Sequence, residues 1–168
     1  ETTVDTREPQ RPTPRQLAHE VSLFWGGLFT NKDLPLRSGF NTGFRYGYHR
    51  LINLSAELET GIAFTDRLGN SGLLGHAQAQ LLFHFTGRGQ PVRPFVLGGG
   101  GWTWFDRFDN GGFPNDSPII IYGAGAKFQW KSSAGFRVDV RNLRMIDGLF
   151  DKRESNNFQL IWGTVFHF

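Results

Sequence analysis

The sequence predicts an all-β fold: an eight-stranded, antiparallel, up-and-down transmembrane β-barrel. Three observations lead to this prediction. Apolar and polar residues alternate over most of the 168 residues, and the connections between the alternating segments are short and long in turn. The chain also combines 17 Phe, 5 Trp and 3 Tyr with a polar mean hydropathy of -0.34. A membrane barrel explains that combination, because only every second residue of its strands faces lipid.

The start of the chain differs from the remainder. Residues 1–17 are polar and contain Pro9, Pro12 and Pro14, so they cannot bury enough apolar surface to order themselves. We expect a flexible periplasmic N-terminal tail over 1–17 and the transmembrane β-barrel over 18–168. No run of 18 apolar residues occurs, which excludes a transmembrane helix. The start lacks the apolar region of a signal peptide, which we expect to have been removed already.

Eight segments from residue 19 onward have the period of two that is typical of strands. They span 19–29, 40–49, 52–64, 73–85, 92–105, 120–130, 134–141 and 158–168. The first four set large apolar side chains against polar or charged ones, as in the pairs Trp25 and Glu20, Phe44 and Arg45, Leu58 and Glu59, and Phe83 and His84. Helices would need apolar residues three and four positions apart, which the cleanest of these segments lack.

The alternation is cleanest in 40–49, 52–64 and 158–168, and the other five segments follow it less uniformly. Segment 92–105 contains four consecutive glycines, so its two faces cannot be assigned from the sequence. We interpret these glycines as relief of crowding in a curved strand, since no phosphate-binding Gly-Lys-Ser/Thr motif follows them. Phe128 opposes Lys127 in 120–130, and Val138 opposes Asp139 in 134–141. Segment 158–168 has one apolar face, formed by Phe158, Leu160, Trp162, Phe166 and Phe168.

The connections between the segments alternate in length. Short ones lie near 49–50, 86–91 and 131–133, and long ones lie at 31–38, 66–72, 106–117 and 142–157. An antiparallel meander therefore places all its long loops at one end and all its short turns at the other. Both termini then lie at the short-turn end, which is the layout of a barrel in a bacterial outer membrane.

The number of aromatic rings decides which face points inward. A soluble, lipocalin-like barrel would bury the apolar faces, but the interior of an eight-stranded barrel is only wide enough for side chains to fill it. The rings on the apolar faces are too many for that space, whereas the opposite faces are rich in Gly, Ser, Asn and Gln. We therefore expect lipid-facing rings around a tight, polar lumen that is plugged by side chains.

Charged residues on the inward faces suggest a network inside this lumen. The expected members are four acids and four bases: Glu20, Arg45, Glu57, Glu59, Lys127, Arg137, Asp139 and Arg141. Charges in so narrow a space are tolerated only when they are paired and hydrogen-bonded. We expect an internal salt-bridge network, and the alternative is a gated ion path or a ligand site.

Several motifs resemble those of bacterial outer-membrane proteins. Phe168, preceded on the same face by Phe166, Trp162, Leu160 and Phe158, resembles their C-terminal signature strand, which implies recognition by the barrel assembly machinery. The run 93–101 resembles the Arg-Pro-(aromatic) strand of OmpA-like small barrels, and 122–128 with 135–141 resembles the next two strands of that family. Residues 156–160 are similar to the last strand of the uncharacterised "outer membrane beta-barrel domain" proteins of myxobacteria and relatives. The resemblance implies contact with outer-membrane lipid and lipopolysaccharide.

An enzymatic alternative has a specific weakness. Residues 123–149 also resemble the lipid A deacylase (PagL-like) barrels, whose catalytic His and Ser lie two residues apart on the following strand. The matching positions here hold Val140 and Asn142. Because a hydroxyl nucleophile is not activated without an imidazole, we expect no enzymatic activity and no cofactor.

The histidines do not predict a metal site. His76 and His84 share a face but lie eight residues apart, about 26 Å at ~3.3 Å per residue. His19 and His167 could approach each other, because the first and last strands of a closed barrel are neighbours. The absence of Cys also excludes thiolate ligands. We therefore expect no metal.

The expected function is structural or interaction-based: a membrane anchor that presents its long loops outward. The alternative is a narrow channel for small or apolar solutes, and a lipid A-modifying enzyme is less favoured. The chain has 18 Lys+Arg against 15 Asp+Glu without a basic block, so we expect no nucleic acid partner. Any periplasmic or membrane protein partner is expected at the tail or the loops.

Overall fold

The computed structural model describes residues 18–29, 38–67, 70–87, 90–107, 115–131, 133–146 and 155–168. The predicted tail over 1–17 and part of every predicted long loop lie outside the described residues. Within those ranges, no helix is long and apolar enough to cross a bilayer.

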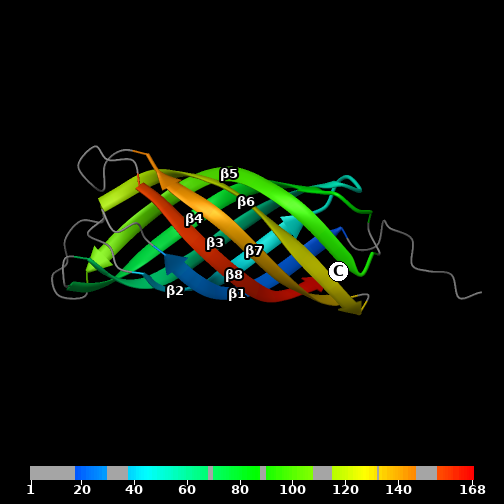
Figure 1. Cartoon of the computed structure of the whole chain (residues 1–168), viewed down its shortest axis with the longest axis horizontal. Coiled ribbons are helices and arrows are strands. Elements are labelled where there is room, and N and C mark those ends of the chain that lie inside the picture. The colour runs from blue at the N-terminus through cyan, green and yellow to red at the C-terminus, as the bar shows by residue number, and fades with distance from the viewer. Residues whose placement is uncertain are drawn as a thin grey trace, which may run out of the picture.

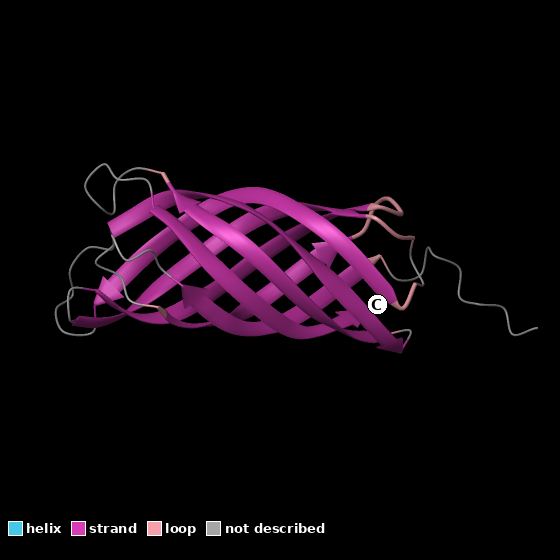
Figure 2. Ribbon diagram, viewed as in Figure 1, coloured by secondary structure: helices cyan, strands magenta, loops and turns pink. Residues whose placement is uncertain are grey.

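The described chain forms eight strands joined in one closed antiparallel sheet, seen from the side in Figure 1 and Figure 2. In order they are β1 His19–Phe29, β2 Gly39–Tyr48, β3 Leu54–Arg67, β4 Asn70–His84, β5 Val92–Arg107, β6 Asn115–Lys131, β7 Ala134–Met145 and β8 Ser155–His167. Each strand pairs with the next in sequence, and β1 also pairs with β8. Closure leaves no strand edge unpaired. The predicted eight-stranded antiparallel barrel is therefore confirmed.

Several strands are longer than the sequence predicts, mainly toward the long-loop end. β6 begins at Asn115 instead of residue 120, and β7 ends at Met145 instead of residue 141. Ile119 pairs with Met145 across these extensions, and both side chains are buried in the lumen. Alternation of apolar and polar residues fails here as a signal, because apolar residues occupy the inner face as well as the outer one.

The short connections lie at the end of the barrel that carries the C-terminus, on the right in Figure 1. There the seam between the first and last strands continues beyond β8. The backbone N–H of His19 donates to the carbonyl oxygen of Phe168 at 3.1 Å, and the N–H of Phe168 donates back to His19 at 3.0 Å. In outer-membrane barrels this short-turn end faces the periplasm.

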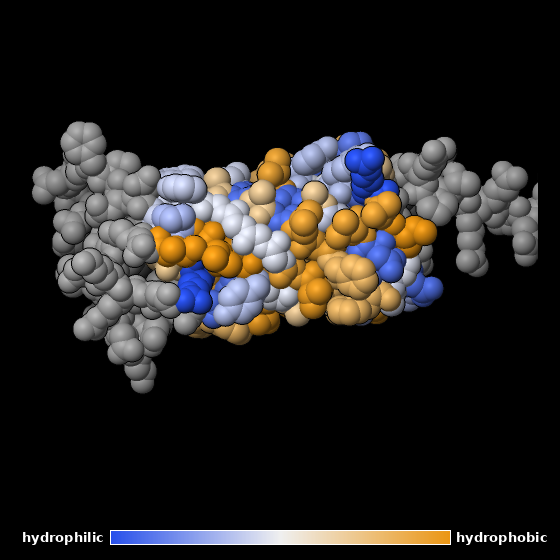
Figure 3. Space-filling view, turned by 90° about the horizontal axis from the view of Figure 1, so that it is seen from above, coloured by the Kyte–Doolittle hydropathy of each residue, from blue (hydrophilic) through white to orange (hydrophobic). Residues whose placement is uncertain are grey.

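Large apolar side chains cover the outside of the barrel, as the orange atoms of Figure 3 show for one face. Trp130 is 64% exposed and Phe168 is 58% exposed, which would be unfavourable in water and is favourable against lipid. Exposed rings occur near both ends of the strands and include Phe29, Phe40, Trp102 and Phe158 toward the long loops, and Tyr48, Phe128, Trp130 and Phe166 toward the short turns. This distribution is that of the aromatic girdles of a membrane barrel.

The inside of the barrel differs from the polar lumen that the sequence predicts. A contiguous apolar cluster fills much of its long-loop half, formed by Leu28, Ala63, Leu74, Leu97, Ile119, Ile121, Leu143 and Met145, and it extends to Leu82 and Phe95. The expected polar lumen is found only in part, because inward positions near the long loops hold apolar side chains in β1, β3, β4, β6 and β7 beside the polar Asn41, Thr103 and Asn157.

The structure also assigns the two faces of β5, which the glycine run obscures in the sequence. Arg93, Phe95, Leu97 and Thr103 are buried in the lumen, and Val96 and Trp102 are exposed on the outside. β5 therefore supplies the lumen with a cation, a ring and an aliphatic side chain.

Candidate functional site: the charged lumen

The residues predicted for the lumen network all lie inside the barrel. Their relative exposure is at most 4% for each of Glu20, Arg45, Glu57, Glu59, Lys127, Arg137, Asp139 and Arg141. They come from β1, β2, β3, β6 and β7 and lie mainly in the half toward the short turns. Strand alternation brings them inward, because each occupies a position of the same parity as the buried residues of its own strand.

Arg137 is central to the network. Its Nη1 donates to both carboxylate oxygens of Glu57 at 2.8 Å, and its Nη2 lies 3.1 Å from Oδ2 of Asp139. Arg141 Nε also reaches Oδ2 of Asp139 at 3.1 Å. The buried carboxylates of Glu57 on β3 and Asp139 on β7 are thus paired with guanidinium groups. Arg can satisfy a buried carboxylate because it donates several hydrogen bonds from a fixed, planar fork.

Glu59 forms a second centre, on the side of the network nearer the apolar cluster. Arg45 Nε donates to its Oε2 at 2.7 Å, and Arg141 Nη1 donates to its Oε1 at 3.0 Å. His76 Nε2 lies 3.3 Å from the same Oε1. Glu59 is therefore paired on both carboxylate oxygens, as a buried carboxylate requires.

Glu20 forms the third centre, at the mouth of the lumen near the short turns. Lys127 Nζ donates to both of its oxygens at 2.7 Å and also to Oε1 of Glu57 at 3.1 Å. His49 Nε2 lies 2.8 Å from Oε2 of Glu20, and His167 Nδ1 lies 3.7 Å from the same oxygen. Lys127 therefore links the mouth to the centre built on Arg137.

His49 lies just beyond the end of β2, outside the membrane-spanning strands. Burial lowers the pKa of His49 from its usual 6.5, although its hydrogen bond to the Glu20 carboxylate acts in the opposite direction. The sequence analysis placed His49 at a turn. Its position has the same parity as the inward-facing Arg45 of β2, and this parity could have shown that His49 points into the lumen.

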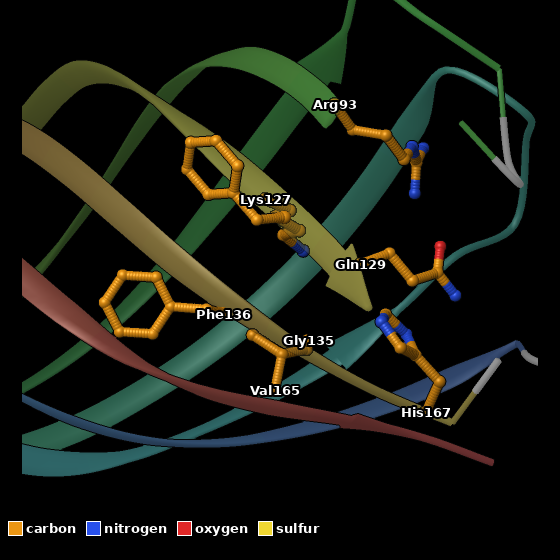
Figure 4. A pocket seen from close by; sticks show the side chains of 8 residues that line it. Arg93, Lys127, Gln129, Gly135, Phe136, Val165 and His167 are labelled. Carbon is orange, nitrogen blue, oxygen red and sulfur yellow. The ribbon is translucent and has the colours of Figure 1, made fainter. Parts of the chain in front are cut away.

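His19 and His167 do not approach each other as the sequence suggested they could. The His19 ring lies outside the barrel wall, stacked on Phe168, with its Nδ1 2.7 Å from the hydroxyl of Tyr46. His167 points inward to the mouth, beside Lys127 and Gln129, as Figure 4 shows. The backbones are neighbours, but the two side chains lie on opposite faces of the sheet.

Two buried rings contribute to the site and were missed by the sequence analysis. The guanidinium carbon of Arg45 lies 5.0 Å from the centroid of the Phe24 ring, and that of Arg137 lies 4.5 Å from the Phe95 centroid. Cation–π contacts of this kind stabilise desolvated cations. The parity of Phe24, which it shares with Glu20, could have revealed it.

A buried hydroxyl–imidazole pair invites an enzymatic interpretation. Ser55 Oγ and His84 Nε2 lie 3.1 Å apart, but their relative exposures are only 2% and 0%. Among the described residues no carboxylate hydrogen-bonds to the other ring nitrogen of His84. An acyl-transfer triad needs that third group and access for a substrate, and this pair shows neither among the described residues.

The charged network and the apolar cluster occupy different depths of the same lumen. The network lies toward the short turns, and most of the apolar cluster lies toward the long loops. The long-loop half also contains buried polar side chains, among them Asn41, Thr103 and Asn157. The lumen therefore has a charged layer and a layer rich in apolar side chains, one after the other along its length.

The residues predicted for the C-terminal assembly signal line the outside of β8. Phe158, Phe166 and Phe168 are exposed, and Leu160 and Trp162 are half-buried between neighbouring strands. They form an apolar stripe that runs beside β1 and is interrupted by Thr164.

Several solved structures share this fold. Neisserial surface protein A gives a TM-score of 0.77 at 15% identity, covering 90% of this chain and 97% of its own. The N-terminal barrel domain of OprF from Pseudomonas aeruginosa gives 0.63 at 19% identity, covering 91% and 98%. The outer membrane protein AlkL in lipid bilayers gives 0.64 at 15% identity, covering 98% and 97%. No family model matches the sequence, and no curated protein is significantly similar to it.

At these identities the likeness shows the fold. The neighbours are small outer-membrane barrels that align over nearly the whole of their own length. They bear out the predicted transmembrane barrel and, with it, the predicted location in a bacterial outer membrane.

Proposed function

We propose that this chain is a closed barrel that acts as an anchoring or interaction protein of the bacterial outer membrane. The observation that carries the proposal is the pair of buried side-chain layers in the lumen, a paired charge network and an apolar cluster. We infer that each layer by itself closes the lumen to ions. A rigid scaffold without a pore leaves its loops and termini as the parts that can act, and loops on rigid scaffolds are where binding usually resides.

Planar-bilayer recording tests the closed lumen. The purified protein is expected to insert without discrete, reproducible openings, while protease protection confirms insertion. Reproducible openings of the wild-type protein would overturn the proposal.

Cross-linking in native membranes tests the interaction role. A partner captured by the wild-type chain should be lost when residues 30–37, 68–69, 108–114 and 147–154 are replaced together by Gly and Ser, or when residues 1–17 are removed. A capture that survives both changes would place the interaction elsewhere and contradict the assignment to loops or tail.

The second candidate is a narrow channel for small or apolar solutes. The apolar cluster in the long-loop half of the lumen favours apolar solutes over ions for such a channel. Its test is uptake of an apolar dye or alkane into proteoliposomes, compared with protein-free vesicles. Uptake above that control would favour the channel over the closed anchor.

The finer assignments belong to the same proposal. The C-terminal stripe and the motif at 156–160 support a place among OmpA-like small barrels, near the outer membrane beta-barrel domain proteins of myxobacteria. The exposed apolar side chains on the outside of the barrel support contact with outer-membrane lipid and lipopolysaccharide, and the stripe on β8 supports recognition by the barrel assembly machinery.

We propose no catalytic role, because Val140 and Asn142 stand where a deacylase needs His and Ser. Mass spectrometry of lipid A with and without the protein tests this point.

A further inference from the structure

The mouth of the lumen gathers imidazole nitrogens around one carboxylate. Glu20, His49 and His167 each offer one ligand atom, and these three atoms all lie within 4.8 Å of one another. They come from β1, from the turn after β2 and from β8, and strand pairing brings them together because β1 lies between β2 and β8. The set therefore rests on the rigid barrel wall.

The spacing suits a transition-metal ion. Two donors bound tetrahedrally to Zn²⁺ at ~2.0–2.1 Å stand about 3.3 Å apart. In the structure His49 Nε2 is 2.8 Å and His167 Nδ1 is 3.7 Å from Oε2 of Glu20. Rotamer changes of about half an ångström at the donor atoms would bring both distances to the required value.

The environment of the donors also suits a metal. Glu20 and His49 are buried, at 1% and 3% exposure, while the side chain of His167 is 12% exposed and opens the cluster to the short-turn end. Figure 4 shows His167 there, beside Gln129 and Lys127. His84 packs against the His49 ring at 5.7 Å between centroids and restricts its orientation. Buried donors with one open side leave a fourth position for water.

Lys127 is the competitor for this site. Its ammonium group lies 2.7 Å from both oxygens of Glu20, where a metal ion would bind. It also donates to Glu57 at 3.1 Å, so it keeps an acidic partner when it leaves Glu20. A bound cation therefore replaces one contact of the ammonium group and leaves the other.

We propose that Glu20, His49 and His167 form a binding site for a divalent transition-metal ion of the Zn²⁺ or Cu²⁺ class, in competition with Lys127. Two imidazoles and one carboxylate select these ions over Ca²⁺ and Mg²⁺, which prefer all-oxygen sites. The site faces the short-turn end and is independent of whether the lumen conducts.

The test is calorimetric titration of untagged, chelator-treated protein in detergent with Zn²⁺ alone. The wild type should bind one ion, and His49→Asn and His167→Asn should each weaken binding at least tenfold. The matched control is His19→Asn, because His19 lies at the same end on the outer face, and its affinity should stay within about twofold of the wild type. Lys127→Met should bind more tightly, since the competing ammonium group is gone. Ca²⁺ should not bind.

Electron paramagnetic resonance of bound Cu²⁺ provides a second measurement. The wild-type spectrum should show hyperfine coupling to two imidazole nitrogens, and either His variant should show coupling to one. Heat-modifiable gel mobility establishes that each variant is folded. The proposal is overturned if folded wild-type protein shows no saturable binding. It is also overturned if His19→Asn weakens binding as much as His49→Asn, or if Lys127→Met binds more weakly.

Discussion

At the scale of single residues, Glu57 joins the parts of the charge network. It accepts hydrogen bonds from Arg137 at 2.8 Å, from Lys127 at 3.1 Å and from Gln80 at 2.9 Å. The buried cations near it depend on this carboxylate for compensation, because desolvated charges are costly when they lose a partner. Its removal should therefore cost far more than the loss of an exposed charge.

The Glu57→Ala variant should lower the free energy of unfolding by about 3–5 kcal/mol, the range measured when one partner of a buried pair is removed. The measurement is a urea titration in detergent, followed by tryptophan fluorescence. Lys131→Ala, at the exposed end of β6, is the matched control and should stay within about 0.5 kcal/mol of the wild type. Equal unfolding midpoints for Glu57→Ala and Lys131→Ala would contradict a stabilising network.

The sequence predicted which side chains point into the lumen where apolar and polar residues alternate regularly, and it failed where they do not. The charges of β2 and β3 could be placed inside because Arg45, Glu57 and Glu59 alternate strictly with apolar neighbours. Phe24 shares the parity of Glu20 and could have been placed inside in the same way, but Phe95 could not, because the glycine run hides the alternation of its strand and an inward ring looks the same in the sequence as a lipid-facing one. Only the position of the cations over these rings identifies their role.

At the scale of a strand, the glycines of β5 have two different environments. A Cβ on the inward Gly99 would collide with the backbone oxygen of Ala79 and the Cα of Gln80 on β4. A Cβ on the outward Gly98 would meet nothing closer than the backbone oxygen of Ile121 at 4.0 Å. Glycine is therefore required at the inward positions 99 and 101, whereas the outward Gly98 has room for a Cβ and the outward Gly100 is tighter, with the backbone oxygen of Ile119 at 3.1 Å.

Gly99→Ala should destabilise the barrel by about 1–3 kcal/mol, the usual cost of overpacking a filled interior. Gly98→Ala should be neutral or stabilising by up to about 1 kcal/mol, because alanine loses less backbone entropy than glycine. The two variants serve as each other's control in the same unfolding titration. A larger loss for Gly98→Ala than for Gly99→Ala would reverse the assignment of the faces of β5.

The last strand carries an element-scale prediction about assembly. Phe168 closes the seam through backbone bonds with His19, which a side-chain substitution leaves in place. If its ring is part of a signal for the assembly machinery, Phe168→Ala should reduce the folded fraction in membranes several-fold. Trp130→Ala removes another exposed ring near the same end and should have little effect.

Heat-modifiable gel mobility measures the folded fraction of both variants in cells. Refolding of the purified proteins into detergent is the control, and Phe168→Ala should refold as well as the wild type. An equal loss of Phe168→Ala in cells and in detergent would assign the ring to stability and remove its role as a signal.

At the scale of the whole molecule, the sequence predicts the closed sheet better than it predicts the contents of the lumen. Loop alternation and strand parity suffice for strand order, because a meander has only one way to close. The division of the lumen could not be predicted, since Ile119 and Ile121 lie in a stretch where both faces are apolar. Their burial follows from the pairing of β6 with β7, which becomes known only once the register is fixed.

The two layers of the lumen make a prediction about conduction that belongs to the whole molecule. If the barriers act in series, opening one should leave the other in place. Ile121→Ser with Leu143→Ser makes the apolar layer wettable, and Glu57→Ser with Arg137→Ser opens the charged layer while removing one charge of each sign. In planar bilayers neither double variant should conduct ions, and the fourfold variant should show discrete openings. Conduction by one double variant alone would show that only one layer seals the lumen, and silence of a folded, inserted fourfold variant would assign the seal to other residues.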